Sequence, residues 1–250
     1  MAPVSVQLFS VRDEAAKDII GVLKKIAGFG YKGVEFAGLH GHSPSEIRKV
    51  LEDLGLVASS AHVGLPTREN VGEMLDTAHT LGYSMMIAGR GPDDFKTLDA
   101  ISRAADAFQS AAALLPKGVR LGYHNHWWEF NRVDGRLGLD FFLERAPGIF
   151  SQLDVYWAAH FGAVDVAKFL AEHKKRTPVL HIKDGPLVRN QPHTAVGKGK
   201  VNIPAIVKAA DPKTLKWLVV ELDSCATDMM TALKESCDYL TSQGLGEGNR

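Results

Sequence analysis

Short apolar runs with strand-like patterning alternate with longer segments of helical spacing along the chain. Residues 4–9 alternate in the manner of a β-strand, and residues 15–29 place apolar side chains at positions 16, 19, 20, 23 and 26, which indicates a helix. The pair then repeats in the first half, with predicted strands at 31–36, 56–62 and 83–88 and predicted helices at 43–54, 68–81 and 92–115.

In the second half, each predicted strand ends on a residue that can bind a metal ion. The runs 119–124, 150–154, 178–181 and 215–221 end on His124, Asp154, His181 and Glu221, spaced 30, 27 and 40 residues apart. A parallel strand with its crossover helix takes about 30 residues or more, so these are equivalent ends of consecutive parallel strands. Predicted helices lie between and after them at 139–145, 164–174, 203–209 and 227–242. Two imidazoles and two carboxylates meeting at one edge predict a mononuclear metal site.

Eight strand–helix pairs predict a single (β/α)8 barrel, the α/β fold with eight parallel strands, over residues 1–242. The length of 250 residues is typical of that fold. A polar, glycine-rich segment at 243–250 is expected to be a flexible tail. The rival is an open doubly wound sheet, but that fold usually has a glycine-rich turn after its first strand, and residues 10–13 contain no glycine.

Composition and charge argue against some classes of binding partner. The formal net charge is zero, which argues against nucleic acid, and no apolar run approaches the roughly 18 residues of a membrane span. The N-terminus lacks a basic region and opens into a strand, so no signal peptide is expected. Cys225 and Cys237 are expected on one helix, too far apart for a disulfide, which indicates a reducing, cytoplasmic location. The oligomeric state is left open, and a homodimer or a homotetramer is possible.

Other polar residues fall at the predicted strand ends, where barrel enzymes build their active sites. Period-two alternation places His126 on the face of His124, and Lys183 on the face of His181. Glu35 and His62 end two earlier strands, where a buried salt bridge is the alternative to a substrate contact. Trp157 belongs to a group of aromatic residues that either cap the barrel or stack on a sugar.

Seven stretches resemble the xylose isomerase-like barrel superfamily, and more narrowly the sugar phosphate isomerase/epimerase proteins. They are GYKGVEF (30–36), SSAHVG (59–64), LGYHNHWWEF (121–130), QLDVYWAAHFG (152–162), LHIKDG (180–185), AVGKGKVNIPAI (195–206) and WLVVELD (217–223). The resemblance implies metal binding by His124, Asp154, His181 and Glu221, with histidine replacing the family's usual first glutamate. It also implies substrate contacts for Glu35, His62, His126, Glu129, Trp157, His160 and Lys183.

The implied activity is that of a divalent-metal-dependent sugar isomerase or epimerase acting on a keto-sugar or sugar derivative through an enediolate. Glu221 is the expected base, His124, His126 or Glu129 the acid, and Lys183 the group that stabilises the oxyanion. The nitrogen and oxygen ligands favour Mn²⁺, Co²⁺, Zn²⁺ or Fe²⁺ over Mg²⁺.

Three alternatives remain open from the sequence. A 3-keto-glycoside lyase or hydratase would eliminate a β-substituent from the same intermediate. A type IV apurinic endonuclease would need three zinc ions, and a sugar-binding barrel would need none.

Overall fold

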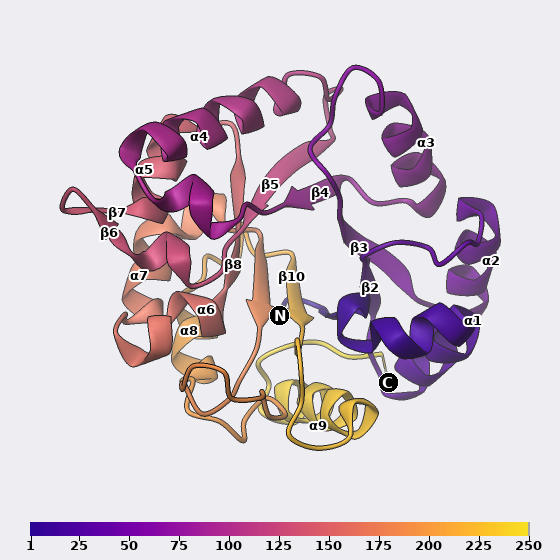
Figure 1. Ribbon diagram of the computed structural model, residues 1–250. Helices are drawn as coiled ribbons and strands as arrows, with labels where there is room; N and C mark the ends of the chain where they lie inside the picture. The colour runs from indigo at the N-terminus through magenta and orange to yellow at the C-terminus, as the bar shows by residue number, and fades with distance from the viewer. Residues whose placement is uncertain (250) are drawn as a thin grey trace.

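The computed structural model describes residues 1–249, and within them eight parallel strands close a barrel in the order β1-β10-β9-β8-β5-β4-β3-β2 (Figure 1). Neighbouring strands follow the chain order around the barrel, and the helices lie outside it, so the predicted (β/α)8 fold is confirmed. The barrel strands are β1 Val4–Gln7, β2 Gly33–Phe36, β3 Val57–His62, β4 Met85–Ala88, β5 Arg120–His124, β8 Phe150–Asp154, β9 Val179–Ile182 and β10 Trp217–Val220.

The outer layer consists of helices whose apolar faces pack on the strands. They are α1 Arg12–Gly28, α2 Pro44–Leu54, α3 Val71–Leu81, α4 Leu98–Ala112, α5 Gly138–Arg145, α6 Val155–Ala158, α7 Val166–His173, α8 Ile203–Ala209 and α9 Met229–Ser242. Local signals set several ends. Ser43 and Glu46 form a capping box at the start of α2, and Gly55, in the left-handed conformation at φ 64°, ends the same helix.

Two local predictions were wrong, and two small elements were not predicted. Residues 92–115 were expected to be one helix, but a 3₁₀ turn at Pro92–Phe95 precedes α4, because Thr97 is extended and caps a new helix at Leu98. A small antiparallel hairpin, β6 Arg132–Val133 with β7 Arg136–Leu137, and the short α6 were not expected. Because α9 begins at Met229, Cys225 lies in the preceding loop and the two cysteines do not share a helix.

The C-terminal segment runs back across the N-terminal side of the barrel. Val4 N–H donates to the Glu247 carbonyl at 3.0 Å, and Asn249 N–H donates to the Gly30 carbonyl at 2.7 Å. The mobility that we expected of residues 243–250 stays a prediction, and Arg250 lies outside the described residues. Within residues 1–249, no helix has the length and apolar character needed to cross a bilayer.

Candidate active site and metal centre

The carboxyl ends of the strands bring the four predicted metal-binding residues together. One ligand atom from each of His124, Asp154, His181 and Glu221 lies within 4.8 Å of the others, and all four residues are buried. Parallel pairing explains part of this convergence, because Asp154 and His181 are register partners on β8 and β9. A second group, His62, His124 and His181, also has donor atoms within 4.8 Å of one another.

Asp154 divides its two oxygens between two tasks. Oδ1 accepts the Trp157 N–H at 2.9 Å and so caps α6, a structural role that is common for an aspartate at the start of a helix. Oδ2 lies 3.0 Å from Lys183 Nζ but accepts no hydrogen bond from residues 1–249. The cap therefore orients the carboxylate and leaves one oxygen available to a cation.

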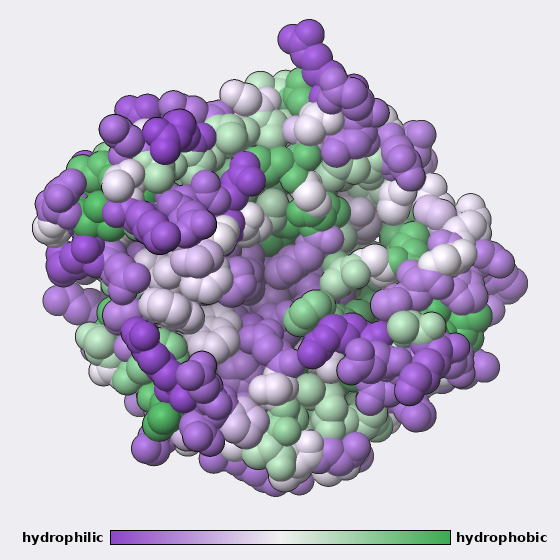
Figure 2. Space-filling model, viewed as in Figure 1, coloured by the Kyte–Doolittle hydropathy of each residue, from purple (hydrophilic) through white to green (hydrophobic). Residues whose placement is uncertain are grey.

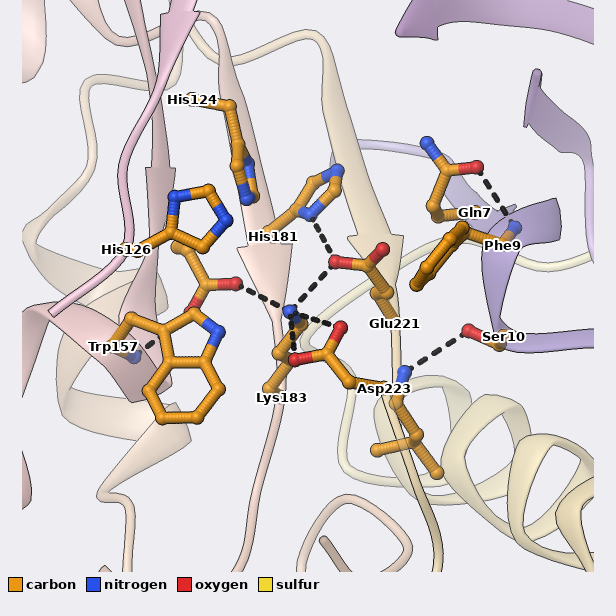
Figure 3. A network of polar contacts seen from close by, with 12 residues as sticks. Gln7, Phe9, Ser10, His124, His126, Trp157, His181, Lys183, Glu221 and Asp223 are labelled. Atoms are coloured by element: carbon orange, nitrogen blue, oxygen red, sulfur yellow. Dashed lines mark hydrogen bonds and ion pairs between the residues drawn. The ribbon is translucent and has the colours of Figure 1, made fainter. Parts of the chain in front are cut away.

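Lys183 lies at the centre of the acidic groups (Figure 3). Its Nζ is 2.7 Å from Glu221 Oε2 and 2.9 Å from Asp223 Oδ1, in addition to Asp154, although the side chain is only 1% exposed. Burial alone would lower the pKa of Lys183, but Asp154, Asp223 and Glu221 outweigh it and hold the pKa well above its ordinary value. Lys183 is therefore a permanent buried cation.

Glu221 is the carboxylate shared by Lys183 and His181. Burial would raise its pKa, but the charges of Lys183 and His181 hold the pKa well below its usual range, so Glu221 is ionised at neutral pH. Both contacts go to Oε2: Lys183 at 2.7 Å and His181 Nδ1, which donates at 3.0 Å. Within residues 1–249, Oε1 has no recorded polar contact, so it is the oxygen available for chemistry.

His181 lies between two carboxylates. Nε2 donates to Glu35 Oε1 at 2.5 Å and Nδ1 donates to Glu221 Oε2. Burial would lower the pKa of His181, but the charges of Glu35 and Glu221 raise it to about 10. Metal-binding histidines commonly donate the nitrogen that does not bind the ion to a carboxylate, and Glu35 supplies that partner on Nε2. Nδ1 is then the ligand atom, once its proton is released.

Glu35, itself fully buried, is the hub of a polar network beneath the pocket. Its oxygens accept hydrogen bonds from Gln7 at 2.7 Å, Ser60 at 2.5 Å and Gln152 at 2.6 Å, and His62 Nε2 lies 3.2 Å away. A register shift between β2 and β3 brings Ser60, rather than Ser59, opposite Glu35. Burial would raise the pKa of this carboxyl, but His181 and His62 hold it well below its ordinary value.

Two residues that we expected to touch the substrate lie deep in the protein. Glu35 and Glu129 are both fully buried. Glu129 accepts the Tyr123 hydroxyl at 2.8 Å and the His126 N–H at 2.9 Å, so its carboxylate is used to shape the loop after β5. In this structure both side chains contact other residues of the site, and their contact with a substrate stays a prediction.

Other expected residues surround a cavity of about 250 Å³ at the mouth of the barrel. Trp157 lies beside it, with Lys183 Nζ 5.6 Å from the Trp157 ring centre. His160 Nε2 donates to Asn131 Oδ1 at 3.1 Å, and His160 is not among the residues that line the cavity. Figure 2 shows this mouth as a hydrophilic hollow. The cavity is lined by Phe9, Ala37, His62, Gly89, His124, His126, Lys183, Glu221 and Asp223.

Sequence reasoning missed Gln152, which joins the two halves of the site. Its Oε1 lies 3.0 Å from His124 Nδ1 and 2.7 Å from His62 Nε2, while Nε2 donates to Glu35. The available signal was alternation, because Gln152 precedes Asp154 by two residues and so shares its face of β8. By the same alternation, Asp223 follows Glu221 by two residues, and it also contacts Lys183.

The glycine-containing loop 197–199 could in principle offer its backbone N–H groups to a phosphate, but it does not form such a site. The N–H groups of Gly197 and Gly199 both donate to Asp184 Oδ2 at 3.0 Å, and Val201 N–H donates to Oδ1 at 3.0 Å. These donors are therefore used to fold the loop around the Asp184 carboxylate.

His193 is a buried histidine beside the site, with 2% of its surface exposed. Nδ1 accepts the Asp223 N–H at 3.1 Å, so a neutral ring carries its proton on Nε2. Burial, and then the charge of Lys183, lowers the pKa of His193 to about 4. The unfolded chain therefore binds a proton in the window between pH 6.5 and 4 that the folded chain does not, so stability falls as the pH falls through this window.

Replacing His193 with asparagine is expected to reduce this acid sensitivity, because the asparagine oxygen can accept the Asp223 N–H but does not titrate. Between pH 7 and pH 5, wild type should lose about 2 kcal/mol more of its free energy of unfolding than H193N does. Urea unfolding at both pH values measures the difference. An equal loss in the two proteins would show that His193 is not the titrating group.

The cluster fits a divalent cation. Its nitrogen and oxygen donors are those of a mononuclear transition-metal site. Once His181 has released a proton to bind the ion, the carboxylates Glu35, Asp154, Glu221 and Asp223 outnumber the cationic Lys183 by three, an excess that one divalent ion offsets in large part. Burial and the neighbouring His181 and His62 lower the pKa of His124 well below its ordinary value, so His124 is a neutral imidazole suited to metal ligation.

Comparisons with solved structures agree with this architecture. A sugar phosphate isomerase/epimerase from Parabacteroides distasonis is 25% identical, with a TM-score of 0.81 over 98% of this chain and 95% of that one. A 3-keto-D-glucoside 4-epimerase from E. coli is 15% identical, with a TM-score of 0.67 over 97% of this chain and all of that one. A family 2 AP endonuclease from Brucella melitensis is 16% identical, with a TM-score of 0.73 over 96% and 98%.

Among proteins with curated functions, none matches this sequence. A family model does match, over residues 23–243, which include every strand of the barrel except β1 and each candidate metal-binding residue. Since the match covers most of the chain, this protein belongs to the xylose isomerase-like TIM barrel family.

Proposed function

We propose that this protein is a divalent-metal-dependent sugar isomerase or epimerase that acts on a keto-sugar or sugar derivative through an enediolate. The observation that carries the proposal is the pair of opposed walls around the cavity: Glu221 with Lys183 on one side, and His124 with His126 on the other (Figure 3). A substrate between them has a base and an acid on different faces.

His124, Asp154, His181 and Glu221 would hold the ion, which when bound supplies a Lewis acid for the substrate carbonyl. Glu221 Oε1 takes the proton from the carbon next to the carbonyl, because Lys183 and His181 keep the carboxylate ionised and oriented through Oε2. Lys183 Nζ places a positive charge beside the developing oxyanion.

His126 is our choice for the group that returns a proton on the opposite face. Its ring lines the cavity, and because Nδ1 is buried 3.8 Å from Glu129 Oε1, Nε2 is the nitrogen that would meet the substrate. His124 is held neutral by burial and by its histidine neighbours, and Glu129 is fully buried, so neither can serve as the acid at neutral pH. Return of the proton to carbon gives isomerisation or epimerisation.

A 3-keto-glycoside lyase or hydratase is the second candidate, since His126 could instead protonate a departing β-oxygen from the same intermediate. A type IV nuclease is disfavoured, because the two metal-competent groups within residues 1–249 share His124 and His181 and so describe one ion rather than three.

Deuterium exchange tests the shared step. Protein loaded with Mn²⁺ is incubated in D₂O with ketohexoses and with methyl 3-keto-β-D-glucopyranoside, and mass spectrometry and NMR measure label at the carbon next to the carbonyl. We expect exchange with at least one compound, its loss on chelation and its return on adding Mn²⁺. Metal analysis should find about one ion per chain. The absence of exchange with every keto compound would exclude both candidates.

A further inference from the structure

Next to the cavity, three aromatic residues and one arginine form a cluster that we call the aromatic rim: Trp127, Trp157, Phe161 and Arg189. The Phe161 ring centre lies 6.0 Å from that of Trp127 and 6.1 Å from that of Trp157. The Arg189 guanidinium lies 4.6 Å from the Trp127 ring centre and 4.9 Å from the Phe161 ring centre. In Figure 2, a pale surface of intermediate hydropathy borders the central hollow.

The aromatic rim is continuous with the reacting centre at both ends. At one end, the Trp157 ring lies 5.6 Å from Lys183 Nζ. At the other, His126 on the cavity wall stacks on Trp128 with ring centres 4.3 Å apart, and Trp128 lies 5.7 Å from Trp127. A ligand that leaves the cavity on this side therefore meets aromatic faces next.

Two strained loops hold the rim in place. His160 and Phe161 adopt left-handed φ values of 46° and 58°, and Leu187 and Asn190, on either side of Arg189, adopt 55° and 58°. Residues other than glycine rarely take such angles, and strain of this kind gathers at ligand sites. Here it places Phe161 and Arg189, from different loops, against each other.

Two groups of the rim retain unused hydrogen-bonding capacity. Trp157 Nε1 is buried without a partner among residues 1–249, although an indole N–H usually finds one. Arg189 is exposed and uses the face of its guanidinium on the rings, and within the described chain its N–H groups have no recorded hydrogen bond or ion pair. A ligand carrying oxygen atoms along a ring edge would satisfy both.

The cavity itself is too small for an extended ligand. Its volume of about 250 Å³ lies below the roughly 300–1,000 Å³ of sites that enclose drug-sized molecules. We propose that the aromatic rim is a subsite for a second ring, joined through a glycosidic oxygen to the sugar that reacts in the cavity. The substrate class is then a glycoside rather than a free monosaccharide, an assignment that rests on the proposed function.

Calorimetric titration with unreactive glucosides tests the subsite without turnover. The Mn²⁺-loaded protein is titrated with methyl β-D-glucopyranoside, 4-nitrophenyl β-D-glucopyranoside and cellobiose, none of which carries the ketone needed for exchange. We expect the nitrophenyl glucoside, cellobiose or both, each of which carries a second ring, to bind about tenfold or more tighter than the methyl glucoside. Whichever of these two binds more tightly identifies the natural second ring as an aryl group or a sugar.

Trp127→Ala and Phe161→Ala should reduce this preference to below about threefold while leaving the affinity for the methyl glucoside unchanged. Arg189→Ala, an exposed position, provides a variant that should fold normally and also lose part of the preference. Phe141→Ala is the matched control, because Arg136 lies 4.4 Å over the Phe141 ring on α5, away from the mouth.

Equal affinity for the three ligands, no binding of any of them, or an equal loss of preference in the Phe141→Ala control would overturn the subsite. The two proposals can fail separately. If the protein prefers ligands with a second ring but catalyses no deuterium exchange, the proposed metal-dependent reaction is wrong and the subsite is supported. If it catalyses exchange without such a preference, only the proposed subsite is wrong.

Discussion

Replacing Glu221 with glutamine is expected to lower the rate of deuterium exchange by at least about 100-fold, the lower end of what a positioned base contributes. The amide keeps the size of the side chain but cannot take the proton. It also weakens the contacts of Oε2 with Lys183 and His181, which hold the group in place. The rate is measured by NMR in D₂O with saturating substrate and Mn²⁺.

Glu52→Gln is the matched control, since Glu52 lies on α2, is more than half exposed and pairs with Arg48 in the preceding turn. Its exchange rate should equal that of wild type. Circular dichroism and bound-metal analysis separate loss of the base from loss of the fold or of the ion. An E221Q protein that retains metal and exchanges at the wild-type rate would remove Glu221 from the mechanism.

Replacing Glu35 with alanine is expected to destabilise the fold by about 3–5 kcal/mol, because it leaves the His181 and His62 side chains and several buried donors without their acceptor. For a chain of this size, that corresponds to a fall in melting temperature of roughly 6–20 °C. Urea unfolding of the metal-free protein at pH 7 measures the change.

The control for this prediction is Glu52→Ala, which removes an exposed pair worth about 1 kcal/mol or less. A loss in E35A no larger than in E52A would show that the network beneath the pocket does not depend on Glu35. Glu35→Gln provides a second comparison, since the amide can still accept two of the hydrogen bonds but carries no charge for His181.

Much of the barrel was predictable because each strand–helix unit carries its own signals. The capping residues and Gly55 define α2 almost to the residue, and residues 203–209 form a helix as expected. The wrong predictions concern places where a few residues, rather than the apolar periodicity, decide where a helix begins or ends. The apolar spacing of 92–115 continues through Thr97, and only the extended backbone there reveals that two helical segments meet.

The candidate site was predictable to the level of its strand ends. Parallel strands place their last residues at one edge, so His124, Asp154, His181 and Glu221 were expected to converge, and their ligand atoms do lie together. The roles of these residues stay predictions. Hydrogen-bond partners could not be predicted, because they depend on which side chains face each other across strands distant in sequence.

The chain's periodicity and strand-end chemistry by themselves determined a parallel α/β barrel with imidazole and carboxylate groups at its mouth. Only the tertiary structure decided how those groups share their charges. Barrel closure places Glu35 against His181, 146 residues away, and a one-residue bulge selects Ser60 as its partner. Such pairings are decided by strand register and by burial, because burial determines which polar atoms must find a partner within the fold. Neither register nor burial can be predicted from the local spacing of residues.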